Sequence, residues 1–184
     1  TDSTIDGKYT KTIIQQKAEL AKHIIAVSGS SKNGGLVLSR SGSASYRLES
    51  KLVKKENSKN ISTMATGFNK TISSIIEITK NDPENLIAPY DIQFQSNIFK
   101  EFAHGSAGIS VRYNSKEVLE EIEQKIKKII NQQKRNKIYQ VQFEGGQKRP
   151  AMEQTTETTE FYNQVLNLAK KNDVKVAKMH RWSS

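Results

Sequence analysis

Two hydrophobic periodicities alternate along the middle of the chain, and their order restricts the fold more than any other feature. Four segments alternate apolar and polar residues with the period of two that is typical of strands: 44–54, 90–99, 105–114 and 136–145. Two segments carry apolar residues three and four positions apart, as amphipathic helices do: 60–80 and 115–133. The order is therefore β-α-β-β-α-β. It predicts an α+β fold of the ferredoxin-like type, a four-stranded antiparallel sheet with both helices on one face.

The segment 115–133 has the strongest helix pattern. Ser115 is expected to cap its first turn, because a hydroxyl at that position can accept a hydrogen bond from an unpaired backbone N–H. Glutamates lie in the first half and lysines in the second, which suits the helix dipole. Six aliphatic residues form the expected core stripe: Val118, Leu119, Ile122, Ile126, Ile129 and Ile130.

The first predicted strand contains the sequence GSASYRLE. Its alternation places Ala44, Tyr46 and Leu48 on one face, and the polar residues between them on the other. The segment 36–40 before it has a second strand pattern. We therefore expect Ser41-Gly42-Ser43 to be the turn of a hairpin that joins the two strands.

The two ends of the chain have different patterns. Residues 10–27 predict a short amphipathic helix, and the Ser- and Gly-rich residues after it a linker. Residues 155–172 predict a helix and 174–182 a strand, which together are typical of one step of an α/β layer. Three regions follow from these patterns, an N-terminal helix and linker, a central domain and a C-terminal fragment: 1–33, 34–147 and 148–184.

The composition excludes several classes of protein. The 184 residues include no cysteine, so disulfides and thiol catalysis are excluded. The formal net charge of +10 favours an anionic partner. No apolar run approaches the ~18 residues that span a membrane, and the N-terminus lacks the apolar core of a signal peptide. The compartment stays open, with the cytoplasm favoured.

Few residues have the pattern of a catalytic or metal site. The three histidines form no metal-binding pair, and no serine nucleophile or phosphate-binding motif is present. We therefore predict no catalytic residue and no metal ligand in this chain. Asn97 and Arg112 lie in two consecutive strands, and we expect the hairpin to bring them together as a site for an anion. The alternative is that Asn97 caps a turn and Arg112 pairs with a helix glutamate.

Three short motifs resemble a known family. GSASYRLE, then SNI followed by VRYN, then RPAMEQTTET occur in the order found in zinc-dependent amidohydrolases, namely glutamate carboxypeptidases, acetylornithine deacetylases and succinyl-diaminopimelate desuccinylases. The resemblance covers about 34–184 and centres on the lid, or dimerisation domain, of this family. It implies that 148–184 is a fragment of the catalytic domain.

The resemblance implies a role for three residues. In the family an Asn and an Arg of the lid bind the substrate carboxylate, and Asn97 and Arg112 match their positions. Arg149 matches a further family arginine. The family's lid histidine is absent, since this chain has Asn57-Ser58-Lys59-Asn60 there, and whether Lys59 or Asn60 takes its role stays open. The zinc ions of the family lie in a separate catalytic domain, so zinc is expected in a parent enzyme and this chain alone is expected to be inactive.

The resemblance also implies a homodimer, formed through strand 44–54 at the sheet edge and helix 60–80. An exposed strand edge favours such pairing. The substrate would be an anionic small molecule or peptide. Two alternatives stay open, a basic ferredoxin-like nucleic-acid-binding module and a catalytically inactive interaction domain. Nucleic acid is the weaker alternative, because strand 105–114 lacks the aromatic residues that stack on bases.

Overall fold

The computed structural model describes residues 10–21, 23–25, 35–53 and 58–181. Its contacts divide the chain into two compact units. The smaller unit combines 1–36 with 156–178, and the larger one combines 37–155 with 179–184. The candidate site lies in the larger unit.

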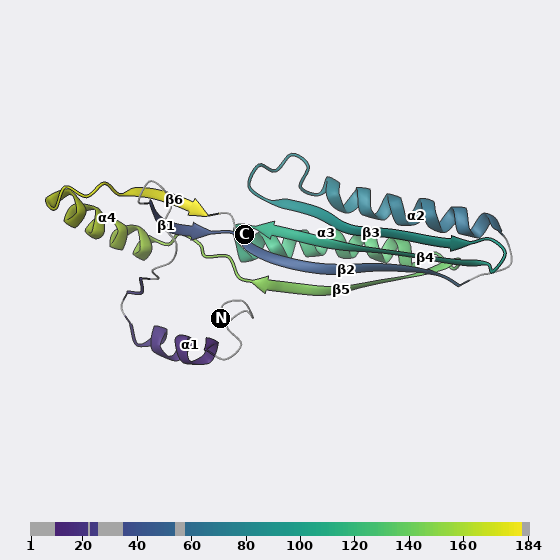
Figure 1. Ribbon diagram of the computed structural model, residues 1–184, viewed down its shortest axis with the longest axis horizontal. Helices are drawn as coiled ribbons and strands as arrows, with labels where there is room; N and C mark the ends of the chain where they lie inside the picture. Colours follow the sequence, from purple (N-terminus) through teal and green to yellow (C-terminus); the bar gives the residue numbers. More distant parts are fainter. Residues whose placement is uncertain (1–9, 22, 26–34, 54–57, 182–184) are drawn as a thin grey trace. The chain divides into compact units, whose positions relative to one another are not determined.

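The larger unit contains a four-stranded antiparallel sheet with the strand order β3-β4-β2-β5 (Figure 1). Its elements follow the predicted order β-α-β-β-α-β: β2 (Gly42–Leu52), α2 (Ser58–Glu77), β3 (Leu86–Asn97), β4 (Phe102–Tyr113), α3 (Lys116–Lys134) and β5 (Tyr139–Arg149). The α+β class and the antiparallel sheet are therefore confirmed.

Both long helices pack on the same face of this sheet. Met64, Phe68 and Ile75 of α2 and the aliphatic stripe of α3 form one core cluster with the inward residues of the strands. The predicted alternation in β2 is confirmed, since Ala44, Tyr46 and Leu48 are buried while the residues between them are more exposed. The cap of α3 is confirmed too, because Ser115 Oγ accepts a hydrogen bond from the Val118 N–H at 3.3 Å.

The predicted hairpin at Ser41-Gly42-Ser43 is wrong. Strand β1 (Gly35–Arg40) does not pair with β2, but forms a two-stranded sheet with β6 (Ala177–Arg181). Gly42 is needed for close packing rather than for a turn, because a Cβ there would lie 2.4 Å from the ring of Tyr113. The chain thus passes directly from one sheet into the other at Ser41.

The prediction that 44–54 is an edge strand is also wrong. β2 is hydrogen-bonded on both sides, to β4 and to β5, so the two edges of the sheet are β3 and β5. β3 begins earlier than expected and includes Pro89, which an edge strand tolerates because one side of it needs no ladder hydrogen bonds. A bulge lies between Tyr90 and Gln93, where Asp91 has a φ of 49°.

The smaller unit contains α1 (Lys11–Glu19) and α4 (Thr156–Lys171). The helix predicted over 10–27 is thus shorter than expected, and 26–27 fall outside the described residues. The ring of His23 stacks on Phe161 with centroids 4.2 Å apart. Among the described helices, none has the length and apolar character needed to cross a membrane.

Candidate anion-binding site

The structure places Asn97 at a turn. Asn97 ends β3 opposite Phe102, and its Oδ1 accepts a hydrogen bond from the backbone N–H of Lys100 at 3.0 Å. This is the capping role that the sequence left as an alternative. The side chain stabilises the β3–β4 turn.

Asn97 and Arg112 do not lie together. Arg112 is paired with Leu86, at the opposite end of the β3–β4 ladder from Asn97. Eleven strand positions separate Leu86 from Asn97, which corresponds to about 35 Å at ~3.3 Å per residue. The expected juxtaposition is wrong because residues equally distant from a turn face each other in a hairpin, and Asn97 is next to the turn whereas Arg112 is far from it.

Arg112 instead lies near a second predicted residue, Arg149. Both are paired with Ser43 of β2, Arg112 from β4 on one side and Arg149 from β5 on the other. A register shift between Ser43 and Ala44 makes Lys148 the extra residue of β5 and sets Arg149 opposite Ser43. Two of the three predicted site residues therefore flank one position of the sheet.

Two further arginines, which the sequence reasoning missed, approach the same end of the sheet. Arg40 ends β1 two residues before Gly42, and its backbone forms a bridge with Met152, three residues after Arg149. The carbonyl of Arg181 in β6 accepts a hydrogen bond from the Ser41 N–H at 3.1 Å. Arg40, Arg149 and Arg181 are named here the arginine cluster.

The arginine cluster has no compensating charge among the described side chains. No ion pair in the described part of the chain includes any of its three guanidinium groups, and Arg112 likewise has none. The Nε of Arg40 is buried, and no described atom accepts a hydrogen bond from it. Burial lowers the pKa of Arg40, and the positive charges of Arg149 and Arg181 lower it further.

A chain of hydrogen bonds holds the strands beside the arginine cluster. Ser39 Oγ lies 2.7 Å from Nδ1 of His180, and Ser41 Oγ lies 3.0 Å from its Nε2. The buried Ser41 hydroxyl also donates to Asn114 Oδ1 at 2.8 Å. These contacts connect β1, β6 and the end of β4, so they fix the backbone segments from which the arginines project.

The described residues do not fit a zinc site. No group of three or more His, Asp or Glu side chains comes together within the described ranges. Zinc in proteins is usually held by three or four such ligands or by cysteine, and this chain has no cysteine. No chemical step through a metal is therefore assigned to these residues.

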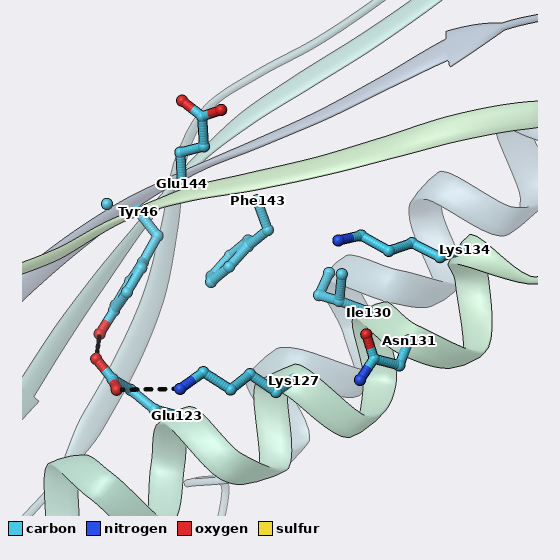
Figure 2. A pocket seen from close by; sticks show the side chains of 9 residues that line it. Tyr46, Glu123, Lys127, Ile130, Asn131, Lys134, Phe143 and Glu144 are labelled. Atoms are coloured by element: carbon cyan, nitrogen blue, oxygen red, sulfur yellow. Dashed lines mark hydrogen bonds and ion pairs between the residues drawn. The ribbon is translucent and has the colours of Figure 1, made fainter.

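A cavity of about 360 Å³ lies between α3 and the edge strand β5 (Figure 2). Tyr46 Oη donates to Glu123 Oε1 at 2.6 Å, and Lys127 lies 3.8 Å from the other carboxylate oxygen. Tyr46 and Phe143 stack with centroids 4.9 Å apart. Burial and the bond to Glu123 raise the pKa of Tyr46, so its hydroxyl stays protonated as a donor. Glu123 thus accepts a hydrogen bond from Tyr46 and forms an ion pair with Lys127, so its charge is compensated within this network.

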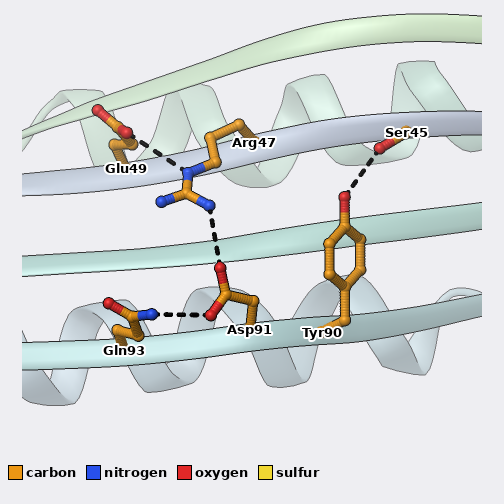
Figure 3. Close-up of polar contacts among 6 residues, drawn as sticks. All are labelled: Ser45, Arg47, Glu49, Tyr90, Asp91 and Gln93. Atoms are coloured by element: carbon orange, nitrogen blue, oxygen red, sulfur yellow. Dashed lines mark hydrogen bonds and ion pairs between the residues drawn. The ribbon is translucent and has the colours of Figure 1, made fainter.

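The sheet face opposite the helices carries a polar network at its centre (Figure 3). Arg47 lies 3.5 Å from both Glu49 and Asp91, and Gln93 donates to Asp91 at 2.8 Å. The three charged side chains are about half exposed, between 41% and 50%, so these pairs contribute little to stability. The arginine cluster differs from these two networks, because no described carboxylate forms an ion pair with it.

Comparison with solved structures shows which proteins share this fold. An aminopeptidase PepT from Bacillus cereus matches 86% of this chain with a TM-score of 0.65 and 13% identity. A hydantoinase/carbamoylase family amidase from Burkholderia vietnamiensis matches 82% with a TM-score of 0.60, and one from Burkholderia phymatum matches 82% with a TM-score of 0.58, both at 10% identity. The chain spans 42%, 37% and 39% of these three structures.

No family model and no curated protein sequence matches the chain. At 10–13% identity the structural likeness shows the fold alone. The chain therefore has the fold of part of peptidase and amidohydrolase structures. Its activity, its substrate and the role of each residue are matters for proposal.

Proposed function

We propose that this chain is the lid and dimerisation portion of a zinc-dependent amide hydrolase, of the carboxypeptidase or deacylase type, with a fragment of the catalytic layer attached. The observation that carries the proposal is the shared fold, which extends over 86% of this chain but only 42% of the aminopeptidase it matches. In this proposal the zinc is held by residues outside the described set. Arg112 and Arg149 hold an anionic group of the substrate, and Asn97 shapes the β3–β4 turn.

A homodimer is part of the proposal, but through β3 instead of the interior strand 44–54. β3 is a long edge strand without a single lysine, whereas the other edge, β5, carries two glycines and Lys148. Ile92 and Phe94 of β3 are 51% and 37% exposed, and Phe94 contacts Phe68 of α2 with ring centroids 6.1 Å apart. Pairing of two β3 edges would cover these side chains and satisfy the open backbone groups of both strands.

We expect the chain to have the mass of two copies in solution, and Ile92→Lys to reduce it to one. A lysine at the centre of the β3 edge places two like charges across the proposed interface and removes an apolar contact. The measurement is light scattering after size exclusion, at several protein concentrations. Gln142→Lys on the exposed side of β5 is the matched control and should stay dimeric. A monomeric parent chain, or equal dissociation by both variants, would refute pairing through β3.

The amide-hydrolase part of the proposal needs a separate test. We expect protein from the full reading frame to bind zinc and to hydrolyse N-acyl amino acids or peptides, and to lose this activity on chelation. We expect the 184-residue chain alone to do neither. The measurements are metal content by mass spectrometry and release of free amine. A full-length protein that folds, binds no zinc and releases no amine would leave only an interaction domain.

A further inference from the structure

Three arginines lie close together in the larger unit, and a fourth, Arg112, is paired with the same strand position as one of them. β1 and β6 bring Arg40 and Arg181 to Ser41, and the register of the larger sheet brings Arg112 and Arg149 to Ser43. Ser41 and Ser43 are only two residues apart. The convergence depends on strand pairings that are distant in the sequence, so it is a product of the fold.

This convergence is energetically unfavourable in the protein by itself. Like charges repel, and no carboxylate in the described ranges pairs with these groups. A buried donor without an acceptor also loses its hydration without compensation, and Nε of Arg40 is such a donor. The lowered pKa of Arg40 has the same causes, burial and the neighbouring Arg149 and Arg181 charges. An anion bound among the guanidinium groups would remove the repulsion between Arg40, Arg149 and Arg181.

The chemistry of guanidinium narrows the ligand class. Each group presents parallel N–H donors that bind a carboxylate or a phosphate in a bidentate manner. One monoanion leaves most of the positive charge of the arginine cluster unmatched, whereas a ligand with two or three anionic groups matches it. Fixed backbone positions, held by the Ser39–His180–Ser41–Asn114 hydrogen bonds, favour a small rigid site over a loose surface patch.

We propose that Arg40, Arg149 and Arg181, with Arg112 beside them, form a binding site for a small molecule that carries at least two carboxylate or phosphate groups. The inference deepens the proposed function, because it uses Arg112 and Arg149 as anion ligands, and it adds Arg40, Arg181 and the multiple charge of the ligand. It does not require a zinc centre or a dimer.

The test is calorimetric titration of the chain with citrate, pyrophosphate and acetate at constant ionic strength. We expect citrate or pyrophosphate to bind with one site per chain and at least tenfold more tightly than acetate. The two multivalent probes separate a carboxylate site from a phosphate site. Equal affinity for all three anions would show only a diffuse positive surface and would overturn the proposal.

Variants distinguish a binding site from a structural role. Arg40→Met should weaken binding of the preferred probe at least tenfold, and Arg149→Met likewise. Because Arg40→Met also removes a buried donor without an acceptor and a charge repelled by Arg149 and Arg181, its unfolding temperature without anion should equal or exceed that of the parent chain. Arg135→Met, at the exposed end of α3, is the control and should change neither quantity.

Two results with the variants would contradict the anion site, and both can be told apart from a failure of the proposed function. Unchanged affinity in Arg40→Met and Arg149→Met would place the anion elsewhere. A lower unfolding temperature of Arg40→Met with unchanged affinity would make Arg40 structural. The lid and dimer proposal is judged by mass and hydrolysis, so it can stand when the anion site fails, and the reverse.

Discussion

Phe68→Ala is expected to lower the free energy of unfolding by about 3–5 kcal/mol, as truncation of a buried aromatic residue usually does. Phe68 is 1% exposed and lies at the centre of the contact between α2 and the sheet. Its ring covers Gly105 of β4, where a Cβ would be only 3.0 Å from the ring carbons. Because glycine leaves this space, α2 lies close to the sheet, and an alanine at 68 would leave a cavity that the backbone cannot close.

The measurement is urea unfolding followed by circular dichroism, with Phe99→Ala as the matched control. Phe99 is 99% exposed, so its truncation removes no described packing and should change stability by less than about 0.5 kcal/mol. Equal losses in the two variants would contradict the position of α2. Phe68→Ala should also weaken the dimer, since Phe68 supports Phe94 beside the proposed interface.

The periodicity of the sequence predicts element types well because each element's burial pattern is local. Tyr46 and Leu48 are buried as their alternation in β2 requires, and Ser115 caps α3 as its position requires. The aliphatic stripe of α3 is buried at Leu119, Ile122 and Ile126. These features depend only on neighbours within a few positions.

Strand pairing is not local, and the errors lie there. Two strand patterns joined by Ser41-Gly42 fit a hairpin, but they fit a change of sheet equally well. The pairing of β1 with β6, some 140 residues further on, is what separates β1 from β2. The resemblance implies that 44–54 is an edge, and the pattern of β2 cannot correct this, because it does not record that two strands flank it. The alternation of β3 also fails to predict its exposure, because residues of both faces are exposed in its second half.

The candidate site likewise combines residues with a local sequence signal and residues that only distant strand pairing brings together. Short motifs predict Arg112 and Arg149 as site residues, whereas Arg40 and Arg181 carry no local signal. Their approach depends on the pairing of β1 with β6 and on the Ser41–Arg181 backbone bond. Arg40 stands between two serines in an ordinary strand, and only burial of its Nε distinguishes it. Asn97 shows the opposite case, a motif residue that the fold uses for a turn.

Gly145→Ala is expected to destabilise the protein by more than about 2 kcal/mol, and by more than Gly146→Ala does. Gly145 has a φ of 135°, and a Cβ there would lie 2.2 Å from the carbonyl oxygen of Ser45 and 2.7 Å from Cα of Tyr46. These are backbone atoms of the central strand, which cannot move without breaking the β2–β5 ladder. Gly146 has a φ of 159°, which also strains an L side chain, but a Cβ there would meet nothing within 4 Å.

Urea unfolding compares the stability of the two variants with that of the parent chain. Titration of all three proteins with a multivalent anion is the second measurement. Gly145 lies two positions before Gln147, where the register shift that sets Arg149 opposite Ser43 begins. A displaced β5 would therefore move Arg149 away from Arg112, so Gly145→Ala should weaken binding of a multivalent anion as well as stability. Gly146→Ala adds backbone strain without a clash, so it should lower both quantities less than Gly145→Ala. If Gly145→Ala unfolds like the parent chain, the close approach of β5 to Ser45 is wrong, and with it the position assigned to Arg149.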